Sequence, residues 1–382
     1  MIKKELGLRI PGPTPIPPSV LQAMQQPMVS HRGTEFTDIV ASLQGDLRYL
    51  FQTENDCLIL AGSGTAAMEA AVANLVAPGR PVLAVVAGKF GERWSQLART
   101  YQADVKELIV PWGQGVDPNQ LAAAIAQHQP EVLFITHNES STGVSQDIAG
   151  AAAICQQAGC LIVVDAISSL GGAEFRTDAW GVDVAITGSQ KCLMLPPGLS
   201  FLAVSQQAWD KMAKNNSPRF YFDLLRYRKG VHNGQAPYTP AVSLIFGLQE
   251  SLRLIRSEGL ENVWQRHRLM QQMIRHGLAA AGVPLFVVEE WASVTVTAAL
   301  APAGLQLEAW RKELAKETGI VLASGQDTLA GRVFRVGHMG YAIPAEMLAI
   351  LGTIEVFLAK AGYAKRLGAG VSAAQEVWLR WQ

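Results

Sequence analysis

A lysine at position 191 ends a short segment in which an apolar, strand-like run leads into Gly188, Ser189 and Gln190. A lysine placed directly after a buried strand commonly extends its amine to the surface. If the amine lies in a cavity instead, burial lowers its pKa and leaves a neutral nucleophile. Such an amine forms an imine with an aldehyde, so Lys191 is a candidate for covalent chemistry.

An aspartate, Asp165, ends another strand-like run 26 positions before Lys191. Taken alone, it could simply cap the next helix. Next to a lysine imine it has a second use, because a buried carboxylate beside a pyridine nitrogen keeps that nitrogen protonated. The positive ring then draws electrons from the substrate's Cα, so the pair Asp165 and Lys191 is more informative than either residue.

A short turn, Ser63-Gly64-Thr65, joins the strand-like run at 58–61 to a helix-like stretch. Unpaired amides and the dipole at a helix start favour an anion such as phosphate, and Gly64 lets the backbone come close. The alternative is an ordinary helix start capped by serine or threonine. An amine, an acid and a phosphate-binding turn at the carboxyl ends of three strands are the groups that hold pyridoxal 5′-phosphate (PLP), which we therefore predict as the cofactor.

Further positions suit a pocket around such a cofactor. Phe90 follows the run at 81–87 and either stacks on the pyridine ring or is a core aromatic. The hydroxyl-rich stretch 136–143 either lines the pocket or forms a turn. Arg335 lies in an apolar run, where its charge is costly unless it is paired. Its planar fork matches a substrate carboxylate, or an internal acid in a structural ion pair.

Apolar runs alternate with alanine-rich helical stretches from about residue 57 onward. The runs predict strands at 57–60, 81–87, 105–110, 131–136, 160–165, 183–187 and 200–204. Buried strands that alternate with helices are typical of an α/β fold whose mostly parallel sheet is covered on both faces. We therefore expect one mostly parallel, seven-stranded sheet that carries the candidate residues.

We divide the chain into an extended, proline-rich N-terminal arm (1–20), a large PLP-binding domain (21–260) and a smaller C-terminal α+β domain (261–382). A long helix over about 241–281 should link the two domains. In the small domain, the alternating segment 291–297 predicts an antiparallel strand with one exposed face. We also expect helices at 306–318 and 344–361, and strands at 320–323 and 332–336.

The composition restricts the class of protein. Charged residues make up 17% of the chain, below the roughly 25% of an average soluble protein. This predicts a large core and a surface partly covered by another subunit. A net charge of zero argues against binding to nucleic acid or to an anionic membrane. We expect a cytoplasmic protein without a metal site, because no run approaches 18 apolar residues and no CxxC pair occurs among Cys57, Cys155, Cys160 and Cys192.

Taken together, these residues resemble the class V group of fold-type I PLP enzymes. The likeness is strongest to the alanine–glyoxylate, serine–glyoxylate and serine–pyruvate aminotransferases. It covers nearly the whole chain, through segments at 11–18, 30–33, 63–65, 136–144, 164–171, 188–191, 237–240 and 334–337. Several motifs in one order are stronger evidence than any one of them.

The resemblance implies a role for each position around the cofactor. Lys191 would carry the covalent link to PLP, and Asp165 would contact the pyridinium. Phe90 would stack on the ring where some relatives carry tryptophan. The phosphate would be held by Ser63, Gly64, Thr65 and Gln190. A second subunit of a homodimer would complete this shared site with Tyr238 or Thr239, and the sequence leaves open which of the two contributes.

For the substrate, the resemblance implies that Arg335 binds the α-carboxylate, that Gly12 closes over the pocket and that Ser140 lies near the ring. The predicted reaction is a ping-pong transamination between an amino acid and a 2-oxo acid, glyoxylate or pyruvate. Arg335 alone stands out as a carboxylate clamp. A small monocarboxylate donor, alanine or serine, is therefore favoured over a dicarboxylate.

Other activities fit less well. A cysteine desulfurase needs a nucleophilic cysteine in its C-terminal part, and no cysteine follows Cys192. Phosphoserine transamination stays open, although it calls for additional basic residues. A non-enzymatic subunit of a soluble hydrogenase, a label that some cyanobacterial relatives carry, also stays open, although the cysteine spacing provides no cluster site. No G-x-G-x-x-G follows the early strands, which disfavours a dinucleotide-dependent oxidoreductase.

Overall fold

The main sheet of the computed structural model, which describes residues 7–363 and 366–381, has seven strands in the order β2-β10-β9-β8-β5-β3-β4. Strand β10 runs antiparallel to both of its neighbours, and the other pairs are parallel. The predicted mostly parallel sheet is therefore confirmed. Its strands are β2 (Asp56–Ala61), β3 (Pro81–Val86), β4 (Asp104–Ile109), β5 (Val132–Thr136), β8 (Leu161–Asp165), β9 (Val184–Gly188) and β10 (Leu199–Val204).

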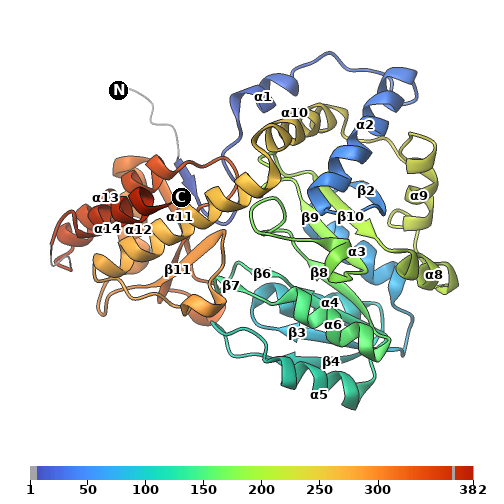
Figure 1. The fold of residues 1–382 in the computed structure, drawn as a ribbon, viewed down its shortest axis with the longest axis horizontal. Coiled ribbons are helices and arrows are strands. Elements are labelled where there is room, and N and C mark those ends of the chain that lie inside the picture. The colour runs from blue at the N-terminus through green and yellow to red at the C-terminus, as the bar shows by residue number, and fades with distance from the viewer. Residues whose placement is uncertain (1–6, 364–365, 382) are drawn as a thin grey trace.

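Helices cover both faces of this sheet because its strands bury side chains on both sides (Figure 1). In β3, Leu83 and Val85 join one core while Val82 and Val86 join the other. The first core is closed by α2 (Thr34–Phe51), α5 (Pro118–His128), α6 (Ile148–Ala158) and α10 (Val242–Glu258). The second is closed by α3 (Gly64–Leu75), α4 (Lys89–Thr100), α8 (Gln206–Lys214) and α9 (Leu224–His232).

A second sheet has four strands in the order β1-β12-β13-β11. Its first strand comes from the N-terminal arm and pairs in parallel with β12, so the two ends of the chain share one sheet (Figure 1). The strands are β1 (Gly7–Arg9), β11 (Val296–Leu300), β12 (Ile320–Ser324) and β13 (Val333–Gly337). Their core is completed by α11 (Leu260–Ala280), α12 (Leu307–Thr318), α13 (Pro344–Lys360) and α14 (Ala369–Arg380).

Two predicted elements differ in the structure. The single helix expected over 241–281 is two helices, α10 and α11, because Gly259 adopts a φ of 84° between them. A glycine reaches this left-handed region without the penalty that a Cβ brings, and a helix cannot continue through it. The strand expected at 291–297 starts only at Val296, after a 3₁₀ turn at Glu289–Trp291. No helix within the described ranges is both long and apolar enough to cross a membrane.

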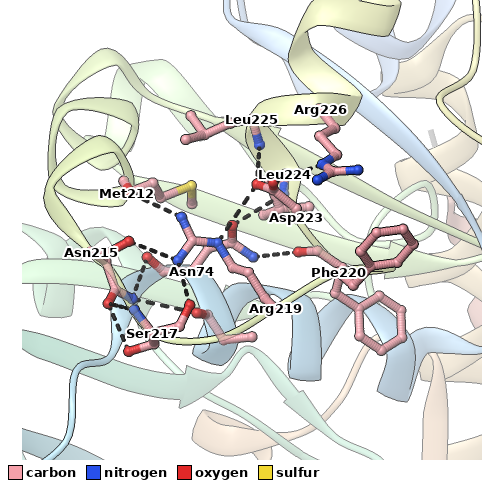
Figure 2. Close-up of polar contacts among 12 residues, drawn as sticks. Asn74, Met212, Asn215, Ser217, Arg219, Phe220, Asp223, Leu224, Leu225 and Arg226 are labelled. Atoms are coloured by element: carbon pink, nitrogen blue, oxygen red, sulfur yellow. Dashed lines mark hydrogen bonds and ion pairs between the residues drawn. The ribbon is translucent and has the colours of Figure 1, made fainter.

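The loop between α8 and α9 is fastened to the end of α3 by a polar network (Figure 2). Asn74 donates to the carbonyl of Phe222 at 2.6 Å, and its side-chain oxygen accepts from the amide of Leu224 at 3.1 Å. Asn215 donates to the carbonyls of Asn74 and Val76 at 2.9 and 3.0 Å. The loop is therefore held in one conformation although it lies outside both cores.

Candidate active site

The predicted lysine lies three residues beyond the end of β9, at the edge of the sheet where the parallel strands end. Its amine donates to the carbonyl of Pro11, and its own carbonyl accepts from the Thr14 hydroxyl at 2.9 Å. The N-terminal arm thus covers Lys191. Burial lowers the pKa of Lys191 to about 8, and the nearby negative charge of Asp165 opposes this change only in part. The amine is therefore much closer to neutrality than an ordinary lysine.

Gly12 lies directly against this lysine, as the sequence predicted for a residue that closes over the pocket. It has a φ of 93°, and a Cβ added there would lie 2.6 Å from Cδ and 2.9 Å from Nζ of Lys191. Both the conformation and the close approach require glycine.

Asp165 ends β8 on the same edge of the sheet and is only 3% exposed. One carboxylate oxygen accepts a hydrogen bond from the amide of Ile167 at 2.8 Å. Burial raises the pKa of Asp165 to about 7, and this outweighs the lowering effect of that hydrogen bond. Within the described ranges Asp165 forms no ion pair. A cation such as a protonated ring nitrogen would stabilise its ionised form, so the carboxylate fits the predicted cofactor.

The predicted phosphate-binding turn begins α3. Ser63 is the N-cap residue, yet its side chain makes no capping hydrogen bond. The Ala66 amide donates to the Ser63 carbonyl at 2.8 Å, but the amides of Gly64 and Thr65 have no partner among the described residues. The side-chain oxygen of Gln190 is buried without a hydrogen-bond partner in the described structure. It points to the same place, because a Cβ on Gly188 would lie 3.2 Å from this oxygen and 3.5 Å from the Gly64 nitrogen. The free amides of Gly64 and Thr65 are donors for a phosphate at this place, and the Gln190 amide, turned about its last bond, would present its NH2 group there, which fits the cofactor.

Phe90 lies in the first turn of α4, whose start is capped by a buried acid that the sequence analysis missed. Glu139 accepts from the amides of Phe90 and Gly91 at 3.0 and 3.1 Å, and from the Ser141 hydroxyl at 2.5 Å. Burial raises the pKa of Glu139, while these hydrogen bonds favour its ionised form. Glu139 thereby fixes the backbone of Phe90, and with it the point from which the Phe90 ring extends.

Arg335 of β13 reaches from the small sheet to the hydroxyl-rich segment that follows β5. Its Nη1 donates to the carbonyl of Ser140 at 2.6 Å, while Nε and Nη2 donate to the carbonyl of Ser324 at 2.9 and 2.7 Å. The residue is 6% exposed, and burial lowers its pKa to about 10. In the part of the chain that the structure describes, Arg335 has no ion-pair partner. A buried cation held only by carbonyls, with N–H groups to spare, suits an incoming carboxylate.

Tyr238 and Thr239 do not join this group of residues. The Tyr238 hydroxyl donates to the carbonyl of Phe220 at 2.8 Å, and its ring stacks on Tyr221 at 4.9 Å between centroids. Thr239 is exposed. Among the described residues, neither side chain is hydrogen-bonded to the turn at 63–65.

Arg93 is a further residue that the sequence analysis missed. Its Nη1 donates to the Thr65 hydroxyl at 3.2 Å, and its guanidinium lies 4.8 Å from the centroid of the Phe90 ring. The available signal was its position, three residues after Phe90 and thus on the same side of a helix.

A lysine after β9, a carboxylate at the end of β8 and a turn with unpartnered amides before α3 are the arrangement expected of a fold-type I PLP enzyme. The chain belongs to the class V aminotransferases, since the family model "Aminotransferase class-V" matches residues 8–344. It is therefore a PLP-dependent aminotransferase.

Known proteins are similar over nearly the full length. The alanine–glyoxylate aminotransferase structure from Nostoc sp. has a TM-score of 0.90 and 37% identity, over 94% of this chain and 96% of that one. The L-aspartate–glyoxylate aminotransferase of Paracoccus denitrificans is 36% identical over 96% of this chain and 94% of its own. A Synechococcus protein named as the small subunit of a soluble hydrogenase is 40% identical over 97% of each chain.

The hydrogenase name of this relative raises the question of a metal-binding cluster. The four cysteines are all free and buried. Among the residues with described positions, no group of three or more His, Cys, Asp and Glu side chains could hold a metal ion.

Proposed function

We propose that this aminotransferase holds PLP on Lys191 and transfers an amino group between alanine or serine and a 2-oxo acid, glyoxylate or pyruvate. The observation that carries the proposal is the buried Lys191 amine, whose pKa is lowered to about 8 beside Asp165. Among the described residues, the amine is hydrogen-bonded to the Pro11 carbonyl and forms no ion pair, which a purely structural role would leave unexplained.

The residues divide the binding of PLP among them. Asp165 would face the ring nitrogen and Phe90 the ring, with Ser140 beside it. Ser63, Gly64, Thr65 and Gln190 would hold the phosphate. When bound, PLP supplies an electron sink for the bonds at the substrate's Cα.

Lys191 moves the proton in this proposal. With a pKa of about 8, a substantial fraction of its amines is neutral near physiological pH and able to accept the proton of the substrate's Cα. The Pro11 carbonyl, which accepts a hydrogen bond from this amine, orients it. The arm that carries Pro11 and Gly12 also keeps water away from the amine.

Arg335 selects the substrate by its carboxylate. One such cation suits a monocarboxylate, which favours alanine or serine as the amino donor. Glyoxylate appears in the names of both the Nostoc and the Paracoccus relatives, and it is our first choice of acceptor. Because the Paracoccus relative is named for aspartate, aspartate is the competing donor, and phosphoserine transamination is a further alternative.

We further propose a cytoplasmic homodimer. Free cysteines suit a reducing compartment. A second copy would add Tyr238 or Thr239 to the phosphate site, since neither side chain is hydrogen-bonded to its own chain's turn at 63–65 among the described residues. A role as a non-enzymatic hydrogenase subunit is the weaker alternative, because it leaves the Lys191 site unexplained.

The test is reduction of the PLP-loaded protein with borohydride, followed by peptide mapping. We expect the label on Lys191 and an unlabelled, colourless Lys191→Ala variant. A label on another lysine would overturn the proposal. Rates for alanine, serine and aspartate against glyoxylate and pyruvate then identify the substrate pair.

A further inference from the structure

Arg93 is a half-buried cation at the proposed phosphate site. Helix α4 carries three cationic side chains, and two of them are ion-paired: Lys89 with Glu92 and Asp327, and Arg99 with Glu107. Arg93 forms no ion pair in the described part of the chain. Its contacts are instead the Thr65 hydroxyl and the Phe90 ring, two groups to which we assign contacts with PLP.

The hydrogen bond to Thr65 determines where that hydroxyl can point. A threonine hydroxyl has one proton to donate and lone pairs to accept with. Because the Thr65 oxygen accepts from Arg93 Nη1 at 3.2 Å, its own proton is directed elsewhere. Within the described residues, this hydroxyl donates to no protein acceptor. A donor without an acceptor at a helix start is suited to an anion.

The contact of Arg93 with Phe90 also restricts a side chain to which we assign a contact with PLP. The guanidinium lies 4.8 Å from the ring centroid, a cation–π distance that restricts both side chains. Arg93 thus connects the group that would meet the phosphate with the group that would meet the ring.

We propose that Arg93 is a positioning residue for the cofactor: it directs the Thr65 hydroxyl toward the phosphate and adds positive charge beside it. This inference rests on the proposed function, because it requires that PLP binds at this site. A charge-assisted donor favours an anionic ligand over its neutral analogue, so the effect should depend on the phosphate.

The experiment compares the binding of PLP and of pyridoxal, which lacks the phosphate, to the cofactor-free protein by absorbance titration. Arg93→Met removes the charge and the donors while it keeps a long apolar side chain. We expect about a tenfold loss of PLP affinity, since hydrogen bonds that involve charged groups are worth that much or more. Pyridoxal affinity should fall less, by about fivefold at most, because only the Phe90 contact is then lost.

Three single variants and one double variant complete the design. Arg99→Met, on the same helix, should bind PLP like wild type because Arg99 pairs with Glu107 instead. Arg93→Lys should recover part of the lost affinity, because it retains the charge. Thr65→Val should weaken PLP binding as well, and the loss in the double variant should be smaller than the product of the two single losses.

The outcomes separate the two proposals. A wild-type protein that binds no PLP refutes the proposed function. If the wild-type protein binds PLP and the Arg93→Met variant binds it with equal affinity, only the inference about Arg93 is refuted. Equal losses for PLP and pyridoxal, or fully multiplicative losses with Thr65→Val, also refute it, because Arg93 would then act on the ring or on the fold. If Arg93→Met does not fold, as judged by circular dichroism, Arg93→Gln is judged by the same comparisons.

Discussion

Burial moves Lys191 and Asp165 toward neutrality from opposite sides. The pKa of Lys191 falls to about 8 and that of Asp165 rises to about 7, although each partly stabilises the charge of the other. Desolvation is the largest cause of both shifts. A protonated ring nitrogen beside Asp165 would stabilise its ionised form. In the cofactor-free protein that ionised form is penalised by burial, and we expect cofactor binding to remove this penalty.

This setting predicts a pH dependence for the cofactor-free protein. The folded pKa of Asp165, about 7, lies above its ordinary value, so the folded state keeps a proton that the unfolded chain loses between about pH 4 and 7. Stability should therefore fall as the pH rises through this window. Asp165→Asn cannot ionise, so its free energy of unfolding should fall less from about pH 5 to 7.5 in urea titrations. Parallel pH profiles for the two proteins would contradict this.

Gly12 gives a second prediction at this scale. In Gly12→Ala, the new methyl group would approach Lys191 Cδ to 2.6 Å at a φ of 93°. We expect about a fivefold to 150-fold loss of PLP affinity, because strain of this kind costs roughly 1–3 kcal/mol. Gly7→Ala is the matched control, since its nearest neighbours lie 3.9 Å away. Equal PLP absorbance titrations of the two variants would disprove the assignment.

The third prediction at the residue scale concerns Arg335. Arg335→Lys keeps the charge but loses the planar fork, so the KM for the amino donor should rise about tenfold or more while PLP binding is unchanged. Steady-state kinetics with alanine and a PLP titration measure the two effects. Arg311→Lys is the control, because Arg311 instead donates to the Leu322 carbonyl and pairs with Glu308. If the KM of Arg335→Lys is unaltered, another residue binds the substrate's carboxylate.

At the scale of elements, the site depends on how α3 is held at both ends. Its start forms the anion-binding turn, and its last turn carries Asn74, which is fully buried and bonded to the loop at 215–223 (Figure 2). Helix α4 is likewise capped by Glu139 at the end that presents Phe90. The network of Asn74 is therefore part of what keeps the turn at 63–65 in place.

The element-level prediction concerns that network. Asn74→Ala leaves the Phe222 carbonyl and the Leu224 amide without their partner. We expect a loss of about 2–3 kcal/mol in the free energy of unfolding, because buried polar groups that lose their partner cost about 1–3 kcal/mol each. Asn119→Ala, at an exposed position, should change stability by no more than about 0.5 kcal/mol. Urea unfolding that fails to separate the two variants would show that the network contributes little.

At the scale of the whole molecule, we propose that the large domain ends near Gly259 and that α11 links it to the small domain (Figure 1). Leu260, Val263 and Trp264 of α11 pack in the first core of the large domain, and its residues from Leu269 onward pack in the core of the small domain. Phe220 and Tyr221 are 66% and 41% exposed beside Tyr238, on a loop that its polar network holds in one conformation. Exposed aromatic rings on a fixed loop suit a contact with a second copy.

This arrangement predicts complementation between two inactive variants. If Tyr238 and Thr239 serve the partner's site, a mixed dimer of Lys191→Ala with Tyr238→Phe/Thr239→Ala contains one intact site. Co-refolded in equal amounts, the two should recover about a quarter of the wild-type activity, because half of the dimers are mixed. Activity no higher than that of the separate variants would place these residues in their own chain's site, and light scattering would test the dimer itself.

Much of the fold was predictable from periodicity. The strands of the main sheet lie close to the predicted runs, and for the inner strands the reason is that a strand buried on both faces is a continuous apolar segment. The edge strand β4 is partly or fully exposed along its length and includes Asp104, Lys106 and Glu107. The break between α10 and α11 at Gly259 was not predictable from periodicity, since a single glycine inside a helical pattern is often tolerated. The start of β11 was also misplaced, because an alternating segment does not reveal where backbone pairing begins.

The residue types and their places at strand ends determined the chemistry: an amine, an acid and an anion-binding turn lie on one edge because parallel strands end there together. Only the tertiary structure decided their partners. The contacts of Lys191 with Pro11, of Arg335 with Ser140 and of Arg93 with Thr65 join residues 180, 195 and 28 positions apart. Local patterns carry no information about such pairs, because packing between elements brings them together.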